Sequence, residues 1–182
     1  MVLLNSSICE YGKKLPDFIL KNIDEEFYSK NDLCGKNGTL ISFICNHCPY
    51  VKAIIKKLVF TQKELKKYGI SCIAIMPNDV KKYPDDSFPK MIEFAKENSF
   101  DCPYLFDENQ KIAKLFQAVC TPDFFGYNSK NELQYRGRIG LMKGLKFIDE
   151  NNELLKAMIQ IAKTGRGPKK QYPSSGCSIK WK

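Results

Sequence analysis

The chain has 182 residues, of which 43% are hydrophobic and 27% are charged, and its formal net charge is +9. This composition is that of one soluble globular domain, and it excludes collagen-like, coiled-coil and disordered chains. Seven lysine and arginine residues follow the last acid, Glu153, which leaves only +2 for residues 1–153, so an electrostatic partner is expected at the C-terminal segment alone.

The sequence predicts neither a membrane anchor nor a signal peptide. The longest apolar run, Leu40 to Cys45, is too short to span a bilayer. The N-terminal residues Met1 to Leu4 turn polar at Asn5 without a basic region or a full apolar region. We therefore expect a cytoplasmic protein, in which the eight cysteines are catalytic, metal-binding or buried thiols rather than four structural disulfides.

The first half of the chain predicts a strand, a helix and a second strand. Residues 15–20 and 26–29 indicate two short extended pieces around a polar turn. Residues 39–45 form an apolar, β-branched run typical of a buried strand. Apolar residues then recur at helical spacing from Pro49 to a terminating Gly69, and a second buried strand covers 70–76. Such a βαβ unit pairs its strands in parallel.

The second half predicts further helices and one hairpin. A helix starts at Ser87 and has one apolar face, made of Phe88, Met91, Ile92 and Ala95. A shorter helical segment follows around 112–116, and residues 123–127 and 133–138 form a β-hairpin. A last amphipathic helix runs from Asp149, its expected N-cap, to Gly165. This order predicts an α/β fold, a central mixed sheet flanked by helices on both faces.

The densest chemical motif is Cys45-Asn46-His47-Cys48-Pro49, at the junction of the first buried strand and its helix. The unpaired N–H groups at a helix N-terminus stabilise a thiolate and lower its pKa. Cys48 directly precedes Pro49 and is our predicted nucleophile, with Cys45 as the nearest resolving thiol. His47, the only histidine, can add positive charge or shuttle a proton.

Two alternatives to a redox site are less favoured. Both thiols of this motif can be inert packing residues. One Cys-x-x-Cys pair with one histidine is also an incomplete zinc site, because a second ligand pair at familiar spacing is missing from the sequence. We expect neither a metal nor another cofactor.

Cys120-Thr121-Pro122 is the second motif. A proline directly before the strand at 123 cannot donate to a ladder, so it belongs at a strand start or in a tight turn. In redox folds of this layout such a proline is cis and faces the dithiol. Cys120 is then either an alternative resolving thiol for Cys48 or a buried small hydrophobe.

The remaining cysteines carry weaker signals. Cys177 lies beside Trp181, and we favour a simple surface anchor over docking of this segment at the active site. The isolated thiols are interpreted as inert, namely Cys9, Cys34, Cys72 and Cys102.

Arg136 and Arg138, two apart in the hairpin, are interpreted as a solvated sheet edge rather than an anion site.

The chain resembles the thioredoxin superfamily and, within it, the peroxiredoxin-like branch of the alkyl hydroperoxide reductase/thiol-specific antioxidant (AhpC/TSA) group. The resemblance covers nearly the whole chain and is carried by Leu15-Pro16-Asp17-Phe18, Gly38 to Phe43, the cysteine motif, Cys102 to Asp107, Thr121-Pro122 and Gly176 to Trp181. It implies a thioredoxin-like three-layer fold over residues 1–165, with an N-terminal extension of about 1–37. It also implies an insert after the βαβ unit, and residues 166–182 are left as a basic tail.

The register of this resemblance separates the chain from both parent groups. It places Cys48 on the nucleophilic cysteine of the thioredoxin Cys-x-x-Cys and Val51 where the resolving cysteine stands. In true peroxiredoxins a threonine or serine lies three residues before the reactive cysteine, whereas Cys45 lies there here.

The leading functional hypothesis is a thiol-disulfide oxidoreductase, with Cys48 attacking a disulfide and Cys45 or Cys120 resolving it. His47, Thr121 and Pro122 are the predicted substrate-binding residues. The alternative is a thiol peroxidase with antioxidant activity, in which Cys48 becomes a sulfenic acid. Either needs a disulfide or peroxide substrate and a thiol electron donor. A non-catalytic module that binds nucleic acid or an acidic protein through its basic tail is less favoured, because the tail charges are spaced rather than clustered.

Overall fold

The computed structural model describes residues 3–182, so Met1 and Val2, where the absence of a signal peptide was predicted, lie outside the described residues. The strands are β1 (Leu3–Asn5), β2 (Ile19–Asn22), β3 (Phe27–Ser29), β4 (Gly38–Phe43), β5 (Ile70–Met76), β6 (Tyr104–Phe106), β7 (Cys120–Thr121), β8 (Asp123–Asn128), β9 (Leu133–Gly137), β10 (Met142–Lys143), β11 (Lys146–Phe147) and β12 (Ser175–Ser178). The helices are α1 (Lys30–Leu33), α2 (Pro49–Lys66), α3 (Phe88–Glu97), α4 (Lys111–Leu115) and α5 (Glu153–Thr164), with a short 3₁₀ helix at Pro84–Asp86.

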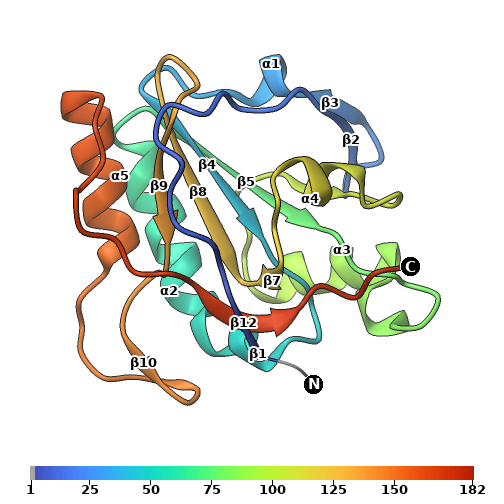
Figure 1. Cartoon of the computed structure of the whole chain (residues 1–182). Helices are drawn as coiled ribbons and strands as arrows, with labels where there is room; N and C mark the ends of the chain where they lie inside the picture. Colours follow the sequence, from blue (N-terminus) through green and yellow to red (C-terminus); the bar gives the residue numbers. More distant parts are fainter. Residues whose placement is uncertain (1–2) are drawn as a thin grey trace.

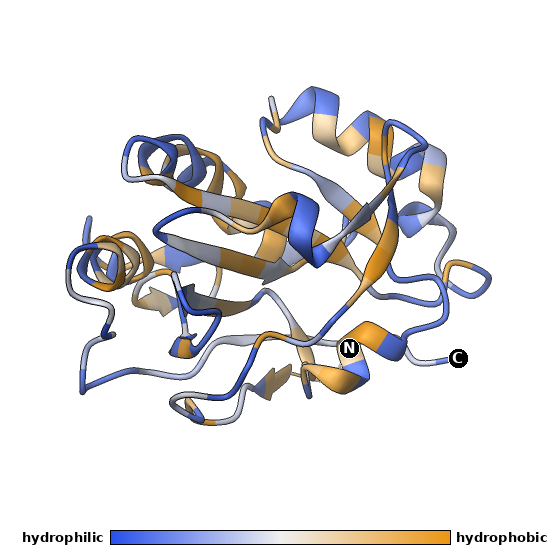
Figure 2. Cartoon of the chain, turned by 90° about the horizontal axis from the view of Figure 1, so that it is seen from above, coloured by the Kyte–Doolittle hydropathy of each residue, from blue (hydrophilic) through white to orange (hydrophobic). Residues whose placement is uncertain are grey.

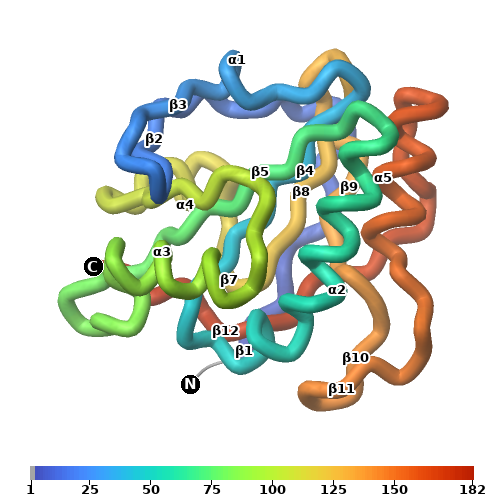
Figure 3. Tube along the Cα trace, turned by 180° about the vertical axis from the view of Figure 1, so that it is seen from behind, coloured from blue at the N-terminus to red at the C-terminus, as the bar shows by residue number. Residues whose placement is uncertain are grey.

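A seven-stranded mixed sheet in the order β3-β2-β6-β5-β4-β8-β9 forms the centre of the molecule (Figures 1 and 3). β4, β5 and β6 are parallel to one another, while β8 and β9 form an antiparallel hairpin on the other side of β4. The predicted βαβ unit and hairpin are therefore confirmed, as is the central mixed sheet flanked by helices.

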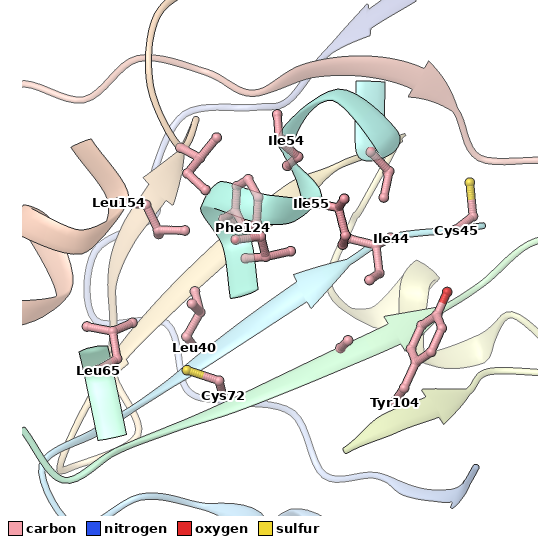
Figure 4. Packing of buried hydrophobic residues seen from close by; sticks show 14 of the residues in the cluster. Leu40, Ile44, Cys45, Ile54, Ile55, Leu65, Cys72, Tyr104, Phe124 and Leu154 are labelled. Carbon is pink, nitrogen blue, oxygen red and sulfur yellow. The ribbon is translucent and has the colours of Figure 1, made fainter. Parts of the chain in front are cut away.

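Helices cover both faces of this sheet. α2, α3 and α5 pack on one face, and every residue of β4 is buried between the layers. Figure 4 shows this side of the core, where Leu40 of β4 lies close to Phe124 of β8 and to Leu154 of α5. The central strands are largely hydrophobic, whereas the outer helices mix hydrophilic and hydrophobic stretches, as amphipathic helices do (Figure 2).

The opposite face is covered by α4 and the N-terminal segment around Leu15. Phe116 packs its ring edge-to-face on Phe43 and Phe125, with centroid distances of 5.2 and 5.4 Å. The two cores fix β4 from both sides, so the residues that follow it emerge at a defined place.

The start of the last helix differs from the prediction. Its N-cap is Asn152 and not Asp149, because the Asn152 side chain accepts a hydrogen bond from the N–H of Leu155 at 3.0 Å. The Asn152 amide also donates to Thr61 Oγ1 at 2.7 Å, which links α5 to α2. Asp149 instead accepts from Asn151 in the preceding loop. The predicted end is confirmed, since Gly165 adopts a φ of 72° there.

Two interpretations of side-chain exposure are wrong. Ile92, assigned to the apolar face of α3, is 40% exposed, because only part of this short helix meets the core. Arg136 does not lie at a solvated edge, whereas Arg138 is partly exposed. Arg136 is 3% exposed and pairs with Asp123 at 3.1 Å, and Arg138 pairs with Glu153 at 2.8 Å.

The C-terminal segment crosses the end of the domain at which β4 finishes (Figure 1). There β12 lies between β1 and β7 in a small antiparallel sheet, with Cys177 opposite Thr121. In the described part of the chain, no helix combines the length and the apolar character needed to cross a membrane.

Candidate active site

The cysteine motif occupies the turn between β4 and α2. Ile44 still donates to the Ile75 carbonyl of β5, so the strand geometry continues to the edge of the motif. Cys48 is the N-cap of α2, and Pro49 holds the first helical position, where its missing N–H costs nothing. The turn thus places the Cys48 side chain at the unpaired N–H groups of an 18-residue helix.

Three sulfur atoms and one threonine form the centre of the site. Cys48 is fully buried, and its Sγ lies 2.9 Å from the Sγ of Cys177 and 3.2 Å from the Thr121 carbonyl oxygen. Cys45 Sγ lies 3.3 Å from Thr121 Oγ1. The Thr121–Pro122 peptide bond is cis, and it directly follows the two-residue strand β7.

The electrostatic environment favours the Cys48 thiolate. A hydrogen bond from Cys45 lowers the pKa of the Cys48 thiol to about 5, with further contributions from the Cys177 thiol and from the backbone N–H of Val51. Burial opposes this shift without cancelling it. At neutral pH, Cys48 is therefore ionised and nucleophilic.

The two neighbouring thiols, Cys45 and Cys177, have raised pKa values. Burial and the hydrogen bond to Cys48 raise the pKa of Cys45 well above its usual value. Burial, together with the same kind of bond, raises the pKa of Cys177 to about 12. The group consists of one thiolate and two thiols that donate to it.

His47 points away from this group, toward Asp86 of the 3₁₀ helix. Its Nδ1 lies 2.6 Å from Asp86 Oδ2, and the carboxylate also accepts from the Asn46 N–H and the Asn78 amide, both at 2.8 Å. The His47 ring stacks on Tyr83 at 5.5 Å. The hydrogen bond with Asp86 raises the pKa of His47, while bonds from His47 and Asn78 lower the pKa of Asp86 against the effect of burial.

Replacement of Asp86 by asparagine is expected to lower the pKa of His47. The carboxylate is the main group that stabilises the imidazolium, so its removal leaves burial as the dominant influence, and burial favours the neutral ring. Because His47 is the only histidine, its ring resonances can be followed by NMR without overlap from another imidazole. The wild type should titrate above pH 6.5 and the Asp86→Asn variant below it. Equal midpoints in the two proteins would contradict this assignment.

The structure brings some of the residues predicted from sequence together and separates others. Cys45, Cys48 and Thr121 meet directly. Pro122 faces a cavity of about 230 Å³ with Tyr50, whereas His47 borders a different depression. The thiol of Cys120 is buried in β7 and donates to the Pro122 carbonyl at 3.7 Å, and burial raises its pKa.

Sequence reasoning missed two residues of this site. The preferred interpretation of Cys177 as a surface anchor is wrong, because its side chain is 1% exposed and contacts Cys48. In the sequence, the nearby Trp181 and the glycine before Cys177 were the only signals that this segment docks at the active site. Asp86 was not identified at all, since an acid in the polar stretch before Ser87 resembles an ordinary loop residue.

Cys45, His47 and Asp86 also offer three possible metal ligands, whose atoms lie within 4.8 Å of one another. Each of these atoms has a hydrogen-bonding role. Cys45 contacts Thr121 Oγ1, and the imidazole and carboxylate bond to each other. These bonds account for the grouping without a cation.

Comparison with known proteins assigns the chain to a family. A crystal structure of an uncharacterized conserved protein from Geobacillus kaustophilus is similar, with 38% identity, a TM-score of 0.94, and coverage of 100% of this chain and 97% of that one. Peroxidoxin BcpB from Mycobacterium tuberculosis shares the fold at 17% identity and a TM-score of 0.58, over 69% of this chain and 82% of that one.

The thioredoxin domain of a thiol-disulfide oxidoreductase from Bacteroides vulgatus shares the fold at 14% identity and a TM-score of 0.57, over 69% and 87% of the two chains. No curated protein matches the sequence. The fold is therefore thioredoxin-like, as the resemblance implied. The AhpC/TSA family model matches residues 11–143, and the chain belongs to this family of thiol-based redox proteins.

Proposed function

We propose that the protein is a thiol-disulfide oxidoreductase in which Cys48 is the nucleophile. One observation carries this proposal. Among the eight cysteines, Cys48 alone has a lowered pKa, whereas the pKa of each of the other seven is raised, chiefly by burial. A single thiolate at a helix N-terminus, held among thiols that donate to it, is the arrangement that disulfide exchange requires.

The reaction begins when the Cys48 thiolate attacks one sulfur of a substrate disulfide. A Cys48 mixed disulfide forms, and the other half of the substrate leaves as a thiolate. A second protein thiol then attacks the Cys48 sulfur and releases the remaining half, for which the sequence indicated Cys45 or Cys120. A thiol electron donor returns the protein to its reduced state.

We propose His47 and Pro122, with Thr121, as the residues that contact the substrate, since His47 directly precedes Cys48 and Pro122 follows the Thr121 carbonyl that contacts it. Pro122 forms part of the wall of the cavity beside Tyr50, which gives a substrate a surface next to the turn. We place the protein in the cytoplasm, where thiols are kept reduced and a thiol donor is available.

Access to Cys48 requires a local opening, because its side chain is 0% exposed beneath β12. The contact of β12 with β7 consists of two residue pairs, Cys177 with Thr121 and Ser178 with Cys120. Separation of so short a ladder costs much less free energy than global unfolding.

The same burial favours a second candidate, a thiol peroxidase. Hydrogen peroxide is small enough to reach a covered thiolate that a folded protein substrate cannot reach. Cys48 is then oxidised to a sulfenic acid, which condenses with a neighbouring thiol to a disulfide and water. Membership of the AhpC/TSA family supports this candidate as well.

Two assays with the full chain and its Cys48→Ser variant separate the candidates. We expect the wild type to reduce insulin disulfides with dithiothreitol as donor and the variant to lose this activity, because an unactivated serine hydroxyl stays protonated at neutral pH and does not exchange with a disulfide. Oxidation of Cys48 by hydrogen peroxide, followed by stopped-flow fluorescence or alkylation, tests the peroxidase. A rate no faster than that of free cysteine would exclude the peroxidase, and full insulin reduction by Cys48→Ser would exclude the oxidoreductase mechanism.

A further inference from the structure

We propose that Cys177, in the C-terminal strand β12, is the thiol that resolves the Cys48 mixed disulfide. The protein would then alternate between a Cys48/Cys177 dithiol and a Cys48–Cys177 disulfide that joins the β4–α2 turn to β12. This inference rests on the proposed function, since it requires that Cys48 first reacts with a disulfide.

The distance between the sulfur atoms is the first argument. Cys48 Sγ and Cys177 Sγ are 2.9 Å apart, whereas a disulfide bond is about 2.05 Å long, so the bond closes with a shift of less than about 1 Å. Of the other candidates, the Cys120 thiol donates to the Pro122 carbonyl instead of Cys48. Cys45 also hydrogen-bonds to Cys48, but its sulfur is held in addition by Thr121 Oγ1 at 3.3 Å.

The attachment of β12 is the second argument. A Cβ at Gly176 would lie 2.1 Å from the Thr121 carbonyl oxygen, so only glycine allows the strand to approach the loop this closely. After Cys177, Ile179 is buried, and the Lys180 N–H donates to Asn78 Oδ1 at 2.9 Å. The fold thus holds Cys177 next to Cys48, although the two residues are 129 positions apart in the sequence. The entropy of bringing the two thiols together is therefore already lost on folding.

The segment before Cys177 is held as well. Ser174 donates to the Gly137 carbonyl at 2.8 Å, and its N–H donates to Ser6 Oγ at 2.9 Å. With anchors on both sides, a local opening of β12 exposes Cys48 to substrate, and reclosure returns Cys177 to the same place.

The chemistry balances without a further reagent. The Cys177 thiolate attacks the Cys48 sulfur of the mixed disulfide, the Cys48–Cys177 bond forms, and the bond to the substrate half breaks. That half leaves as a thiolate and takes up the proton that Cys177 lost. In total the Cys48 thiolate and the Cys177 thiol give two electrons and one proton to the substrate disulfide, and solvent supplies the second proton, so that the substrate becomes two thiols.

Electrostatic interactions favour attack by Cys48 first and resolution by Cys177 second. In the reduced protein the negative charge of Cys48 contributes to the raised pKa of Cys177, so the second thiol stays protonated. Formation of the mixed disulfide removes that charge and the hydrogen bond with it. Cys177 then ionises more easily at the moment when its thiolate is needed.

This arrangement also accounts for the departure from the thioredoxin motif. Val51, which stands at the position of the thioredoxin resolving cysteine, is buried in the core of α2 and carries no thiol. A resolving cysteine contributed by β12 reaches Cys48 from a segment distant in the sequence, so the turn does not need a second cysteine after Cys48.

The test uses the full reduced chain and one equivalent of 5,5′-dithiobis(2-nitrobenzoate) at about pH 6, where Cys48 is the ionised cysteine. We expect the wild type to release about two equivalents of thionitrobenzoate per equivalent of reagent and to end as a disulfide that peptide mapping assigns to Cys48–Cys177. Cys177→Ala should release about one equivalent and keep the other as an adduct on Cys48.

Three further variants make the outcome specific. Cys177→Ser keeps a hydrogen-bond donor beside Cys48 and should trap the same adduct, which separates lost thiol chemistry from lost packing. Cys120→Ala should still give the Cys48–Cys177 disulfide. Cys72→Ala is the matched control for removal of a buried thiol far from the site, and its circular dichroism and melting are compared with those of Cys177→Ala.

The possible failures are distinguishable. A wild-type map that joins Cys48 to Cys45 or Cys120, or a second release that survives Cys177→Ala, overturns the inference and leaves the proposed function in place. If Cys48 forms no adduct in any variant, the proposed function fails and the inference fails with it.

Discussion

Alkylation of Cys48 by iodoacetamide is expected to reach half of its maximal rate near pH 5 and to change little above about pH 7. The reactive species is the thiolate, so the rate rises with pH through the pKa and then levels off. An unperturbed cysteine, with a pKa of about 8.5, is ionised only to a few per cent at pH 7. Mass spectrometry of the Cys48 peptide after short exposures at a series of pH values gives the profile.

Cys45→Ala should shift this profile to higher pH. The hydrogen bond from Cys45 is the largest cause of the lowered pKa, and alanine removes the donor without adding a charge. A shift of about one unit lowers the ionised fraction, and with it the rate, about fivefold at pH 5 and about twofold at pH 6. Cys72→Ala, in the middle of β5, is the control and should leave the profile unchanged. A wild-type midpoint above pH 8 would contradict the assignment of Cys48 as the thiolate.

Arg136→Met is expected to destabilise the fold by roughly 3–5 kcal/mol, because it leaves the Asp123 carboxyl buried without its cation. Asp123 is 0% exposed, and Arg136 also donates to the Gln117 carbonyl and covers the ring of Phe125. Urea unfolding at equilibrium, followed by circular dichroism, measures the loss.

Arg138→Met is the matched control, two residues along the same chain segment. Its partner Glu153 is partly exposed, as Arg138 is, so this ion pair contributes about 1 kcal/mol or less. A double variant, Arg136→Met with Asp123→Leu, removes both buried charges and should recover part of the lost stability. Equal losses for the two arginine variants would show that the buried pair has no special cost.

The loss in Arg136→Met should grow with pH. Burial raises the pKa of Asp123 to about 7 although Arg136 opposes the shift. A carboxyl with a raised pKa in the folded state binds its proton there, so its contribution to stability is complete below about pH 4 and is lost as the pH rises through about 7. Without the guanidinium the pKa rises further. The free energy difference between variant and wild type should therefore be larger at about pH 8 than at about pH 5.

The sequence indicated the central part of the fold because that part depends on local patterns. The apolar run before Cys45, the helical spacing after Pro49 and the second apolar run at 70–76 are together typical of a βαβ unit. The sequence indicated the proposed nucleophile, Cys48, for the same reason. A cysteine directly before a proline at the start of a helix has its chemistry set by the helix N-terminus, which is a local feature.

The environment of a residue that contacts partners distant in the sequence could not be predicted from local patterns. From its position in the sequence, Arg136 is typical of an exposed sheet edge. In the structure it is buried, and Asp123 compensates its charge. The N-cap of α5 was assigned to Asp149, because several polar residues precede the helix and each can cap it; in the structure Asn152 accepts from the Leu155 N–H and is held in addition by its bond to the distant Thr61.

The eight cysteines and the charge of +9 also separate what local sequence determines from what distant contacts determine. The sequence by itself indicated Cys48 as the proposed nucleophile and determined that the positive charge is concentrated at the C-terminal end, because both follow from neighbours along the chain. Only the tertiary structure decided which groups face Cys48. Cys177 is far away in sequence, and it reaches the site because β12 pairs with β7 and because Gly176 lets the two backbones approach. Contacts of this kind are specified by packing of the whole domain, which no single segment encodes.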